Sequence, residues 1–332
     1  MVNTTNIVDK FGRTHDYLRI SLTERCNLRC FYCMPEEGIQ LRDKKEFMSS
    51  EELLAIAKTF VDLGIKKIRL TGGEPLIKKN AEFIIRELSK LPIELAITTN
   101  AVVIDRFIDV LKESGVKSIN VSLDSLIEER FDNISRRNYF KKIIDNIELL
   151  IQNDFHVKLN VVVIKGVNDD EIIDFVNLTK KKRIHVRFIE FMPFDGNNWN
   201  WDKKVSYKAI LNEIDEKLGA NSYLKIEDHK NDTARNFRLL NSVGTFAIIS
   251  SVTNPFCDTC NRIRLTADGK IKNCLFSSDE ADLLKAYRNN ESVEGLIRQA
   301  IKEKHKERGG MIDFSDESVN AHPNRSMTTI GG

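Results

Sequence analysis

Short apolar segments alternate with longer amphipathic segments over the first 190 residues of the chain. The amphipathic segment 51–63 places Leu53, Ala57 and Phe60 on one helical face, and Ser49 and Glu52 form a capping box at its start. The apolar segments have the length and composition of buried strands, and they are Tyr17–Leu22, Lys67–Thr71, Glu94–Thr98, Ser118–Leu123, Val157–Ile164 and Ile184–Glu190.

Six strand–helix repeats predict an α/β fold with a parallel sheet and right-handed crossovers. Six units are too few to close an eight-stranded barrel. We therefore expect an incomplete (β/α)6 TIM-like barrel, with a flat, doubly wound sheet as the alternative. In both folds the ligand site lies at the carboxyl ends of the strands.

The pattern changes after Phe194, where the polar segment 195–202 predicts a boundary. We expect a partial barrel over residues 1–194 and an α+β region over residues 195–332 that covers its open side. Helices are predicted near 206–218, 281–288 and 293–303, and strands near 223–227, 237–240 and 245–249. The final segment, Ser315–Gly332, is predicted to be unstructured by its composition.

Composition narrows the class of protein. Basic and acidic residues are nearly balanced, with a formal net charge of +2, which argues against a broad basic face. Nucleic-acid binding is therefore not expected. No run of 18 apolar residues is present, and the first residues have neither a signal-peptide core nor a transit-peptide pattern. We expect a cytoplasmic enzyme that does not bind membranes.

The six cysteines fall into two triplets, C-x3-C-x2-C near one end and C-x2-C-x13-C near the other. Cytoplasmic cysteines remain thiols, and three cannot pair off locally, so metal binding is favoured over disulfides. A structural zinc or a four-iron cluster normally takes four protein ligands. Each triplet is one ligand short, which indicates two metal centres with an open position.

Three thiolates on a four-iron cluster leave one iron free to bind S-adenosylmethionine (SAM), and electron transfer then releases a 5′-deoxyadenosyl radical. The first triplet, with Tyr32 before its last cysteine, resembles the signature of the radical SAM superfamily. The next predicted strand ends in Gly72-Gly73-Glu74-Pro75, and the superfamily has a similar motif that meets the SAM amino group. A zinc knuckle is the alternative for the first triplet.

Strand alternation places several cations on the face opposite their apolar neighbours. These cations are Arg19, Arg69, Lys158, Arg187, Arg262 and Arg264. If helices cover the outside of the barrel, these side chains point inward and need acids or an anionic ligand. Local salt bridges, for instance to Glu74 or Glu190, are one possibility, and a triphosphate held by bidentate arginines is the other.

Segments along nearly the whole chain resemble the GTP 3′,8-cyclase family of radical SAM enzymes, also called molybdenum cofactor biosynthesis protein A. The matching segments include SLTERCNLRCFYCMP, RLTGGEPL, VSLDSL, RFIEFMPF and PFCDTCNRIRLTADGKIKNCLFS, and the resemblance extends to the final Gly331-Gly332. Two positions depart from the family pattern: Lys78 stands where arginine is expected, and Ala101 where glycine is expected.

The resemblance implies a role for each group of residues. A first [4Fe–4S] cluster would be held by Cys26, Cys30 and Cys33. A second [4Fe–4S] cluster, whose open iron binds the guanine of GTP, would be held by Cys257, Cys260 and Cys274. SAM contacts are implied for Tyr32, Gly73, Ser122 and Met192. GTP contacts are implied for Arg19, Arg69, Thr98, Lys158, Arg262, Ile263 and Arg264. Catalytic roles are implied for Arg262, Arg264, Gly331 and Gly332, since the family's tail reaches the active site.

The implied reaction begins when the 5′-deoxyadenosyl radical takes a hydrogen atom from ribose C3′ of GTP. The C3′ radical attacks guanine C8, and reduction gives 3′,8-cyclo-7,8-dihydro-GTP, the first intermediate of molybdenum cofactor biosynthesis. The implied partners are GTP, an external one-electron donor, cyclic pyranopterin monophosphate synthase as the next enzyme of the pathway, and a second copy of the chain in a homodimer.

Two other functions remain open from the residues alone. A radical SAM enzyme acting on peptide or RNA would share the first triplet. A zinc-stabilised binding module would need a fourth ligand for the second triplet, such as His229 or His305, and neither stands at ligand spacing.

Overall fold

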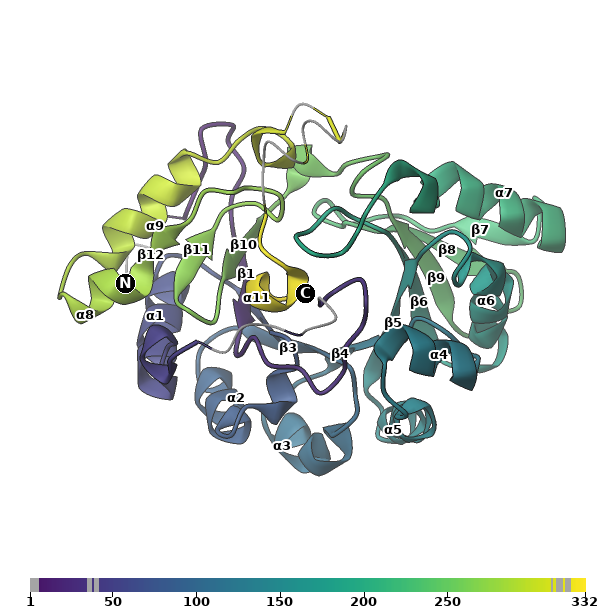
Figure 1. The fold of residues 1–332 in the computed structure, drawn as a ribbon, viewed down its shortest axis with the longest axis horizontal. Coiled ribbons are helices and arrows are strands. Elements are labelled where there is room, and N and C mark those ends of the chain that lie inside the picture. The colour runs from purple at the N-terminus through teal and green to yellow at the C-terminus, as the bar shows by residue number, and fades with distance from the viewer. Residues whose placement is uncertain (1–5, 35–37, 39–41, 312, 315–318, 320–323) are drawn as a thin grey trace.

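The predicted parallel sheet is present in the computed structural model, which describes residues 6–34, 38, 42–311, 313–314, 319 and 324–332. Its first six strands follow the predicted segments closely. They are β1 (Tyr17–Ser21), β2 (Lys67–Thr71), β3 (Glu94–Thr99), β4 (Ser118–Ser122), β5 (His156–Val163) and β6 (Ile184–Glu190). They lie side by side in chain order, and each pairs with the next in parallel. The sheet curves around an open interior (Figure 1), so the incomplete barrel is confirmed and the flat sheet is not found.

The C-terminal half adds strands to both edges of this sheet. These strands are β7 (Tyr223–Lys225), β8 (Arg235–Leu239), β9 (Thr245–Ile249), β10 (Arg262–Leu265), β11 (Lys270–Lys272) and β12 (Ala281–Asp282). Strand β9 pairs in parallel with β6, and β10 pairs in parallel with β1. The strands of the C-terminal half therefore do more than cover the open side, because they satisfy the backbone groups at both edges of the six-stranded unit.

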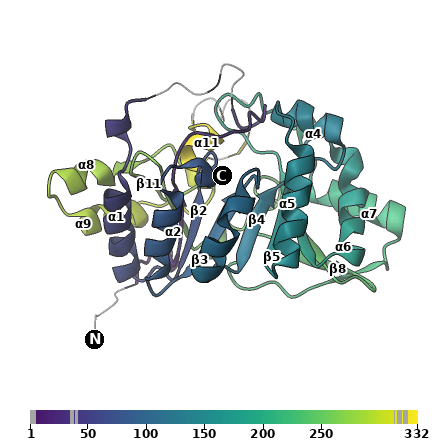
Figure 2. The same cartoon turned by 90° about the horizontal axis from the view of Figure 1, so that it is seen from below.

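Helices pack on the outer face of the sheet (Figures 1 and 2). They are α1 (Ser50–Asp62), α2 (Ala81–Ser89), α3 (Ile108–Glu113), α4 (Glu128–Ser135), α5 (Phe140–Gln152), α6 (Ile172–Lys181), α7 (Tyr207–Leu218), α8 (Leu283–Arg288) and α9 (Val293–Lys302). The capping box of α1 is confirmed, because the Glu52 N–H donates to Ser49 Oγ at 3.2 Å and the Ser49 N–H donates to Glu52 Oε2 at 2.8 Å. No helix among the described residues is long and apolar enough to span a bilayer.

The core lies between the helices and the outward-facing strand residues. Leu18 and Ile20 of β1 are fully buried, as are Phe60 of α1 and Phe175 of α6. Apolar residues alternate with polar ones along these strands, so the same alternation that fills this core directs polar side chains into the barrel.

The prediction for the C-terminal segment is wrong where the structure describes it. Residues 327–330 form a short helix, α11 (Met327–Ile330), and Ile330 is buried against Phe194 and Phe276. The predicted residues 315–318 and 320–323 lie outside the described part of the chain. A four-residue helix has no detectable periodicity, so only tertiary contacts specify it. Similarly, the predicted helix 281–288 begins at Leu283, because residues 281–282 pair with β11.

Ala101, one of the two departures from the family pattern, has a φ of 62°. This left-handed conformation costs a residue with a Cβ roughly 1–2 kcal/mol and favours glycine. The position follows β3 and is fully buried, and its carbonyl accepts a hydrogen bond from Asn146 Nδ2 at 2.7 Å. The backbone conformation therefore explains why the family pattern has glycine at this position.

Candidate active site

Inward-facing positions of adjacent strands bring three guanidinium groups to one level of the barrel. Parallel register places Arg19 of β1 beside Arg69 of β2 on one side and beside Arg264 of β10 on the other. Arg262 lies one inward position lower on β10, beside Tyr17. Lys158 and Arg187 face the same interior from β5 and β6, where burial and Arg187 lower the pKa of Lys158, and burial and Arg69 lower that of Arg187.

None of these six cations forms a salt bridge with an Asp or Glu side chain among the described residues. Arg69 donates to the Ile97 carbonyl at 2.8 Å, and Arg187 donates to Asn160 Oδ1 at 2.5 Å. Local pairing with Glu74 or Glu190 does not occur, because both carboxylates accept hydrogen bonds elsewhere. Glu74 is bonded by Thr99 and Asn100, and Glu190 by residues 252–253.

The charge is concentrated in a buried environment. Burial and neighbouring cations lower the pKa of Arg19 to about 10, of Arg187 and Arg264 to about 9, and of Lys158 to about 8. Arg19 Nε, Arg187 Nε and Arg262 Nη1 are buried and have no hydrogen-bond acceptor within the described structure. Unpaired buried cations are costly, so this interior is suited to a multiply charged anion.

Tyr17 belongs to the same cluster, although sequence analysis did not identify it. Its hydroxyl accepts a 2.6 Å hydrogen bond from Arg69 Nε, and the Arg262 guanidinium lies 5.6 Å from its ring centroid. Burial alone would raise the pKa of Tyr17, but Arg69, Arg19 and Lys67 lower it to about 7. The alternation that identified Arg19 also places Tyr17, two residues earlier, on the inner face.

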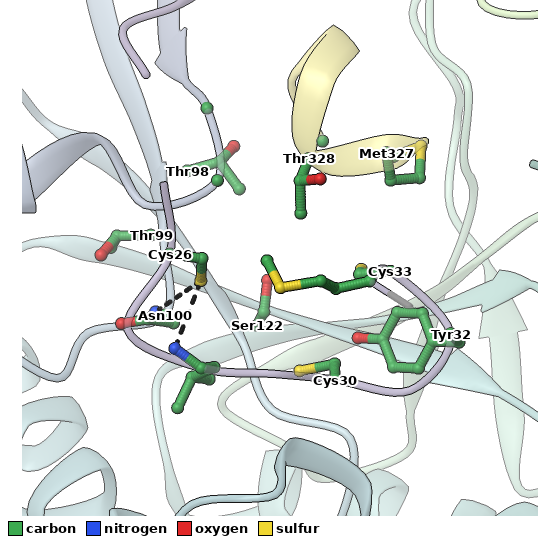
Figure 3. Close-up of a pocket in the computed structure, with 15 residues that line it drawn as sticks. Cys26, Cys30, Tyr32, Cys33, Thr98, Thr99, Asn100, Ser122, Met327 and Thr328 are labelled. Carbon is green, nitrogen blue, oxygen red and sulfur yellow. Dashed lines mark hydrogen bonds between the residues drawn. The ribbon is translucent and has the colours of Figure 1, made fainter. Parts of the chain in front are cut away.

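The first cysteine triplet lies in the loop that follows β1, at the carboxyl end of the sheet. Its thiols line a partly open cavity (Figure 3). Cys26 Sγ accepts hydrogen bonds from the Leu28 N–H at 3.4 Å and from Asn100 Nδ2 at 3.7 Å. The cavity is also lined by Tyr32, Gly72, Gly73, Thr98, Thr99, Ser122, Met327, Thr328 and Gly332.

Buried carboxyl groups surround this triplet. The Tyr32 hydroxyl donates to Asp124 Oδ2 at 2.5 Å, and burial raises the pKa of Asp124 to about 6 and of Glu74 to about 7. Burial, together with Glu74, raises the pKa of Cys26 to about 11. Burial also raises the pKa of Cys30 and Cys33, so binding of a metal by these thiols must displace their protons.

The paired glycines at the end of β2 contact the backbone that leads into the first triplet. A Cβ on Gly72 would lie 2.5 Å from the Thr23 carbonyl oxygen, and one on Gly73 would lie 2.3 Å from the Arg25 carbonyl oxygen. The Gly73 N–H donates to the Thr23 carbonyl at 2.7 Å, and the Glu74 N–H donates to the Arg25 carbonyl at 2.8 Å. Glycine is thus required here by the protein's own backbone as well as by any ligand.

Replacing Gly73 with alanine should displace the cysteine loop and lower SAM cleavage by about 10²-fold, a loss typical of a reacting group moved by about 1 Å. Iron bound at the first triplet should fall in parallel. Gly295→Ala, at the start of α9, is the control, because its Cβ would meet only the flexible Ser292 side chain at 3.2 Å. Cleavage at the wild-type rate in Gly73→Ala would contradict the packing argument.

The structure brings together most of the predicted SAM contacts. Tyr32, Gly73 and Ser122 line the cavity, whereas Met192 is not among its lining residues and packs beside Phe194 and Phe276. Thr98 faces the inner side of β3, where its Oγ1 accepts from Asn120 at 3.4 Å, while Thr99 Oγ1 donates to Glu74. Thr98 is therefore the threonine that is free to contact a substrate. Ile263 has a fully buried side chain, so only its backbone could do so.

The second triplet surrounds β10 and β11. Cys257 lies in the short helix η6 (Cys257–Thr259), Cys260 precedes β10, and Cys274 follows β11. Burial, together with the neighbouring Cys274 and Cys260, raises the pKa of Cys257. Arg13 anchors the loop, since it donates to the Cys257 carbonyl at 2.8 Å and is paired with Asp9 at 2.6 Å.

The spacing of the ligands bears on which group could bind. Among the described residues, no three Cys, His, Asp or Glu side chains converge as they would around a single ion. In Figure 3 the sulfurs of Cys26, Cys30 and Cys33 are spread along the cavity wall. All six cysteines are free and half-buried, so each triplet presents three sulfur ligands. This donor set suits an iron–sulfur cluster.

The C-terminal tail enters the barrel and reaches both groups of residues. Arg19 donates to the Gly332 oxygen at 2.5 Å, and Arg264 donates to the Gly331 carbonyl. Met327 and Thr328 of α11 lie over the cavity at the first triplet (Figure 3). The tail is held by Arg325, whose guanidinium pairs with three carboxylates, which belong to Glu24, Asp268 and Glu280. No periodicity in the sequence indicated Arg325.

Comparison with known protein families agrees with this arrangement. Residues 20–179 match the model of the radical SAM superfamily, and residues 184–309 match the model named Molybdenum Cofactor Synthesis C. In overall fold the chain is similar to SuiB of Streptococcus suis, with a TM-score of 0.60 over 87% of this chain and 69% of that one, at 16% sequence identity.

Sequence relatives are much closer. A protein of Arabidopsis thaliana named GTP 3′,8-cyclase, mitochondrial, is 44% identical over 98% of this chain and 83% of its own length. GTP 3′,8-cyclase of Listeria welshimeri is 40% identical over 98% of both chains. Human molybdenum cofactor biosynthesis protein 1 is 42% identical, and this chain spans about half of its length (51%). The chain therefore belongs to the GTP 3′,8-cyclase family of the radical SAM superfamily.

Proposed function

We propose that this protein converts GTP into 3′,8-cyclo-7,8-dihydro-GTP, by forming a bond between ribose C3′ and guanine C8, as the first step of molybdenum cofactor biosynthesis. Family membership and the names of the full-length plant and bacterial relatives support this reaction. The observation that carries it is the set of buried, acid-free cations inside the barrel, which is suited to a triphosphate.

The substrate would lie between the two cysteine triplets. The first triplet follows the carboxyl end of β1, and Cys260 precedes the amino end of the neighbouring strand β10. Arg19, Arg69 and Arg264 lie beside one another on adjacent strands, between the two triplets. Planar guanidinium groups bind phosphate oxygens in pairs, so these three side chains would hold the triphosphate and fix the direction of the nucleoside.

Other residues would complete the substrate pocket. Lys158 and Thr98 would contact GTP from β5 and β3, while Arg262 and the Ile263 backbone would contact it from β10. The Tyr17 hydroxyl already accepts from Arg69, so its own proton is free to be donated to a phosphate oxygen. The Gly331 and Gly332 oxygens accept hydrogen bonds from Arg264 and Arg19, respectively, so the two glycines would be repositioned when GTP binds.

SAM would bind over the first triplet, in contact with Tyr32, Gly73 and Ser122 and, if the 192–199 loop moves, with Met192. Cys26, Cys30 and Cys33 would hold a [4Fe–4S] cluster, which would supply the electron for reductive cleavage of SAM and thereby the radical that removes the C3′ hydrogen. The surrounding residues would position SAM: the Tyr32 hydroxyl donates to Asp124, which fixes the ring, and α11 lies over the cavity.

A second [4Fe–4S] cluster at Cys257, Cys260 and Cys274, with guanine at its open iron, is part of the proposal. Three sulfur ligands, half-buried and close to Arg262 and Arg264, support it. We also propose an external one-electron donor, a homodimer, delivery of the product to cyclic pyranopterin monophosphate synthase, a cytoplasmic location suited to free thiols, and the division of the chain at residue 194.

Anaerobic reconstitution followed by iron and sulfide analysis tests the metal content. We expect about eight iron and eight sulfide per chain, and mass analysis with SAM, reductant and GTP should show the cyclised product. Two zinc and no sulfide would instead favour a binding module. Cleavage of SAM without modification of GTP would favour a radical SAM enzyme acting on peptide or RNA.

Cys274→Ala separates the two centres. It should halve the iron content and abolish GTP cyclisation, while SAM cleavage without GTP continues at the first triplet. The matched control is Cys30→Ala, which should abolish both activities. Cyclisation at the wild-type rate in Cys274→Ala would remove the second triplet from the mechanism.

A further inference from the structure

Lys304, which follows α9, is a buried cation beside the second triplet. It is only 2% exposed. Its ammonium donates to the Arg262 carbonyl at 3.1 Å and to Cys260 Sγ at 3.5 Å. It forms no salt bridge with a carboxylate in the described part of the chain.

The groups around Lys304 do not supply the missing negative charge. His15 is fully buried, and burial and the charge of Lys304 lower its pKa to about 4, so it is neutral. The nearby carboxylate of Asp9 is already paired with Arg13 at 2.6 Å. A buried ammonium needs an anion. The sulfur of Cys260 is the atom in contact that can provide it, once a metal has replaced the thiol proton.

The two triplets therefore have opposite electrostatic environments. Among the described residues, Cys26 Sγ accepts hydrogen bonds from the neutral N–H groups of Leu28 and Asn100, and its site contains the buried carboxyls of Glu74 and Asp124. Burial and Glu74 raise the pKa of Cys26, and the nearby Arg29 guanidinium has a smaller, opposing effect. Cys260 accepts from an ammonium, and Arg262 and Arg264 lie close by. Positive charge and hydrogen bonds to sulfur raise the reduction potential of an iron–sulfur cluster, and negative charge lowers it.

We propose that Lys304 sets the reduction potential of the second cluster and holds it above that of the first. The inference rests on the proposed function, because it requires a cluster at Cys257, Cys260 and Cys274. Uptake of one electron from the external donor adds one negative charge next to Cys260. The fixed ammonium stabilises that charge, so the second site is the easier of the two to reduce.

The test is a redox titration of the complete, reconstituted protein, followed by electron paramagnetic resonance, with the second signal identified by its loss in Cys274→Ala. Lys304→Met should lower the reduction equilibrium constant of the second cluster at least tenfold, which is about 59 mV for a one-electron couple. The first cluster should not shift. Lys304→Arg should remain close to wild type, and Lys302→Met, on the exposed end of α9, should change neither signal.

Lys304→Gln removes the positive charge but keeps a hydrogen-bond donor, so it separates the two effects. It also replaces Lys304→Met as the test variant if the methionine variant fails to bind the cluster. We expect Lys304→Gln to shift the potential as the methionine variant does. A wild-type potential in Lys304→Gln or in Lys304→Met would overturn the proposal. A wild-type protein with about four iron and a single signal would instead refute the second cluster, so the two failures are distinguishable.

Discussion

Replacing Arg264 with leucine is expected to lower kcat/KM for GTP by about 10²- to 10⁴-fold. Arg264 lies at the centre of the proposed substrate site, beside Arg19 in the β1–β10 register. Two charge-assisted hydrogen bonds to a phosphate contribute about 1.5–3 kcal/mol each, and each 1.4 kcal/mol is a factor of ten. The rate of product formation, measured over a range of GTP concentrations, gives the change in KM and in kcat.

Two further variants make this result specific. Arg264→Lys keeps the positive charge but loses the planar guanidinium group. Its kcat/KM for GTP should therefore lie between those of the wild type and Arg264→Leu. Arg238→Leu, on the exposed side of β8, should leave kcat/KM unchanged. SAM cleavage without GTP should persist in all three. An equal loss of SAM cleavage in Arg264→Leu would show that the first site, and not phosphate binding, has been damaged.

Replacing Arg325 with alanine should release the tail from the barrel. This guanidinium pairs with Glu24 at 3.0 Å, Asp268 at 3.2 Å and Glu280 at 3.1 Å, and the Glu24 and Asp268 side chains are each only 4% exposed. Breaking a buried pair costs up to about 3–5 kcal/mol, because the remaining charges stay buried without a partner. Arg42 still contacts two of the carboxylates, which keeps the expected loss at the lower end.

Hydrogen exchange of residues 327–332 measures this release directly. We expect their protection to fall by about 10²-fold in Arg325→Ala and much less in Arg325→Lys, with a parallel fall in GTP cyclisation. Lys302→Ala is the control for a surface cation near the C-terminus. Unchanged protection of the tail in Arg325→Ala would show that its apolar contacts and its hydrogen bonds to Arg19 and Arg264 are sufficient to hold it.

Local patterns in the sequence predicted a large part of this site. Period-2 alternation placed Arg19 and Arg69 inside the barrel, and it could have placed Tyr17 there by the same rule. The cysteine spacings identified both candidate metal sites. These features are visible because each depends on residues that are neighbours in the chain.

The features that sequence analysis missed depend on contacts between distant segments. The parallel pairing of β10 with β1 joins residues about 245 positions apart, and no periodicity encodes it. Lys304 has the sequence of an ordinary cation at a helix C-terminus, and only the fold shows that it is buried. The carboxylates that hold Arg325 come from three separate loops, so the tail looked unstructured.

The pairing of β1 with β10 also fixes the distance between the two cysteine sites. Cys26 and Cys260 lie beyond opposite ends of this strand pair, whose four paired positions each advance about 3.3 Å along the strand. The span between the two sites is thus set by covalent geometry and by hydrogen bonds, with no hinge between them. The distance that the proposed substrate must bridge is therefore expected to be the same in every turnover.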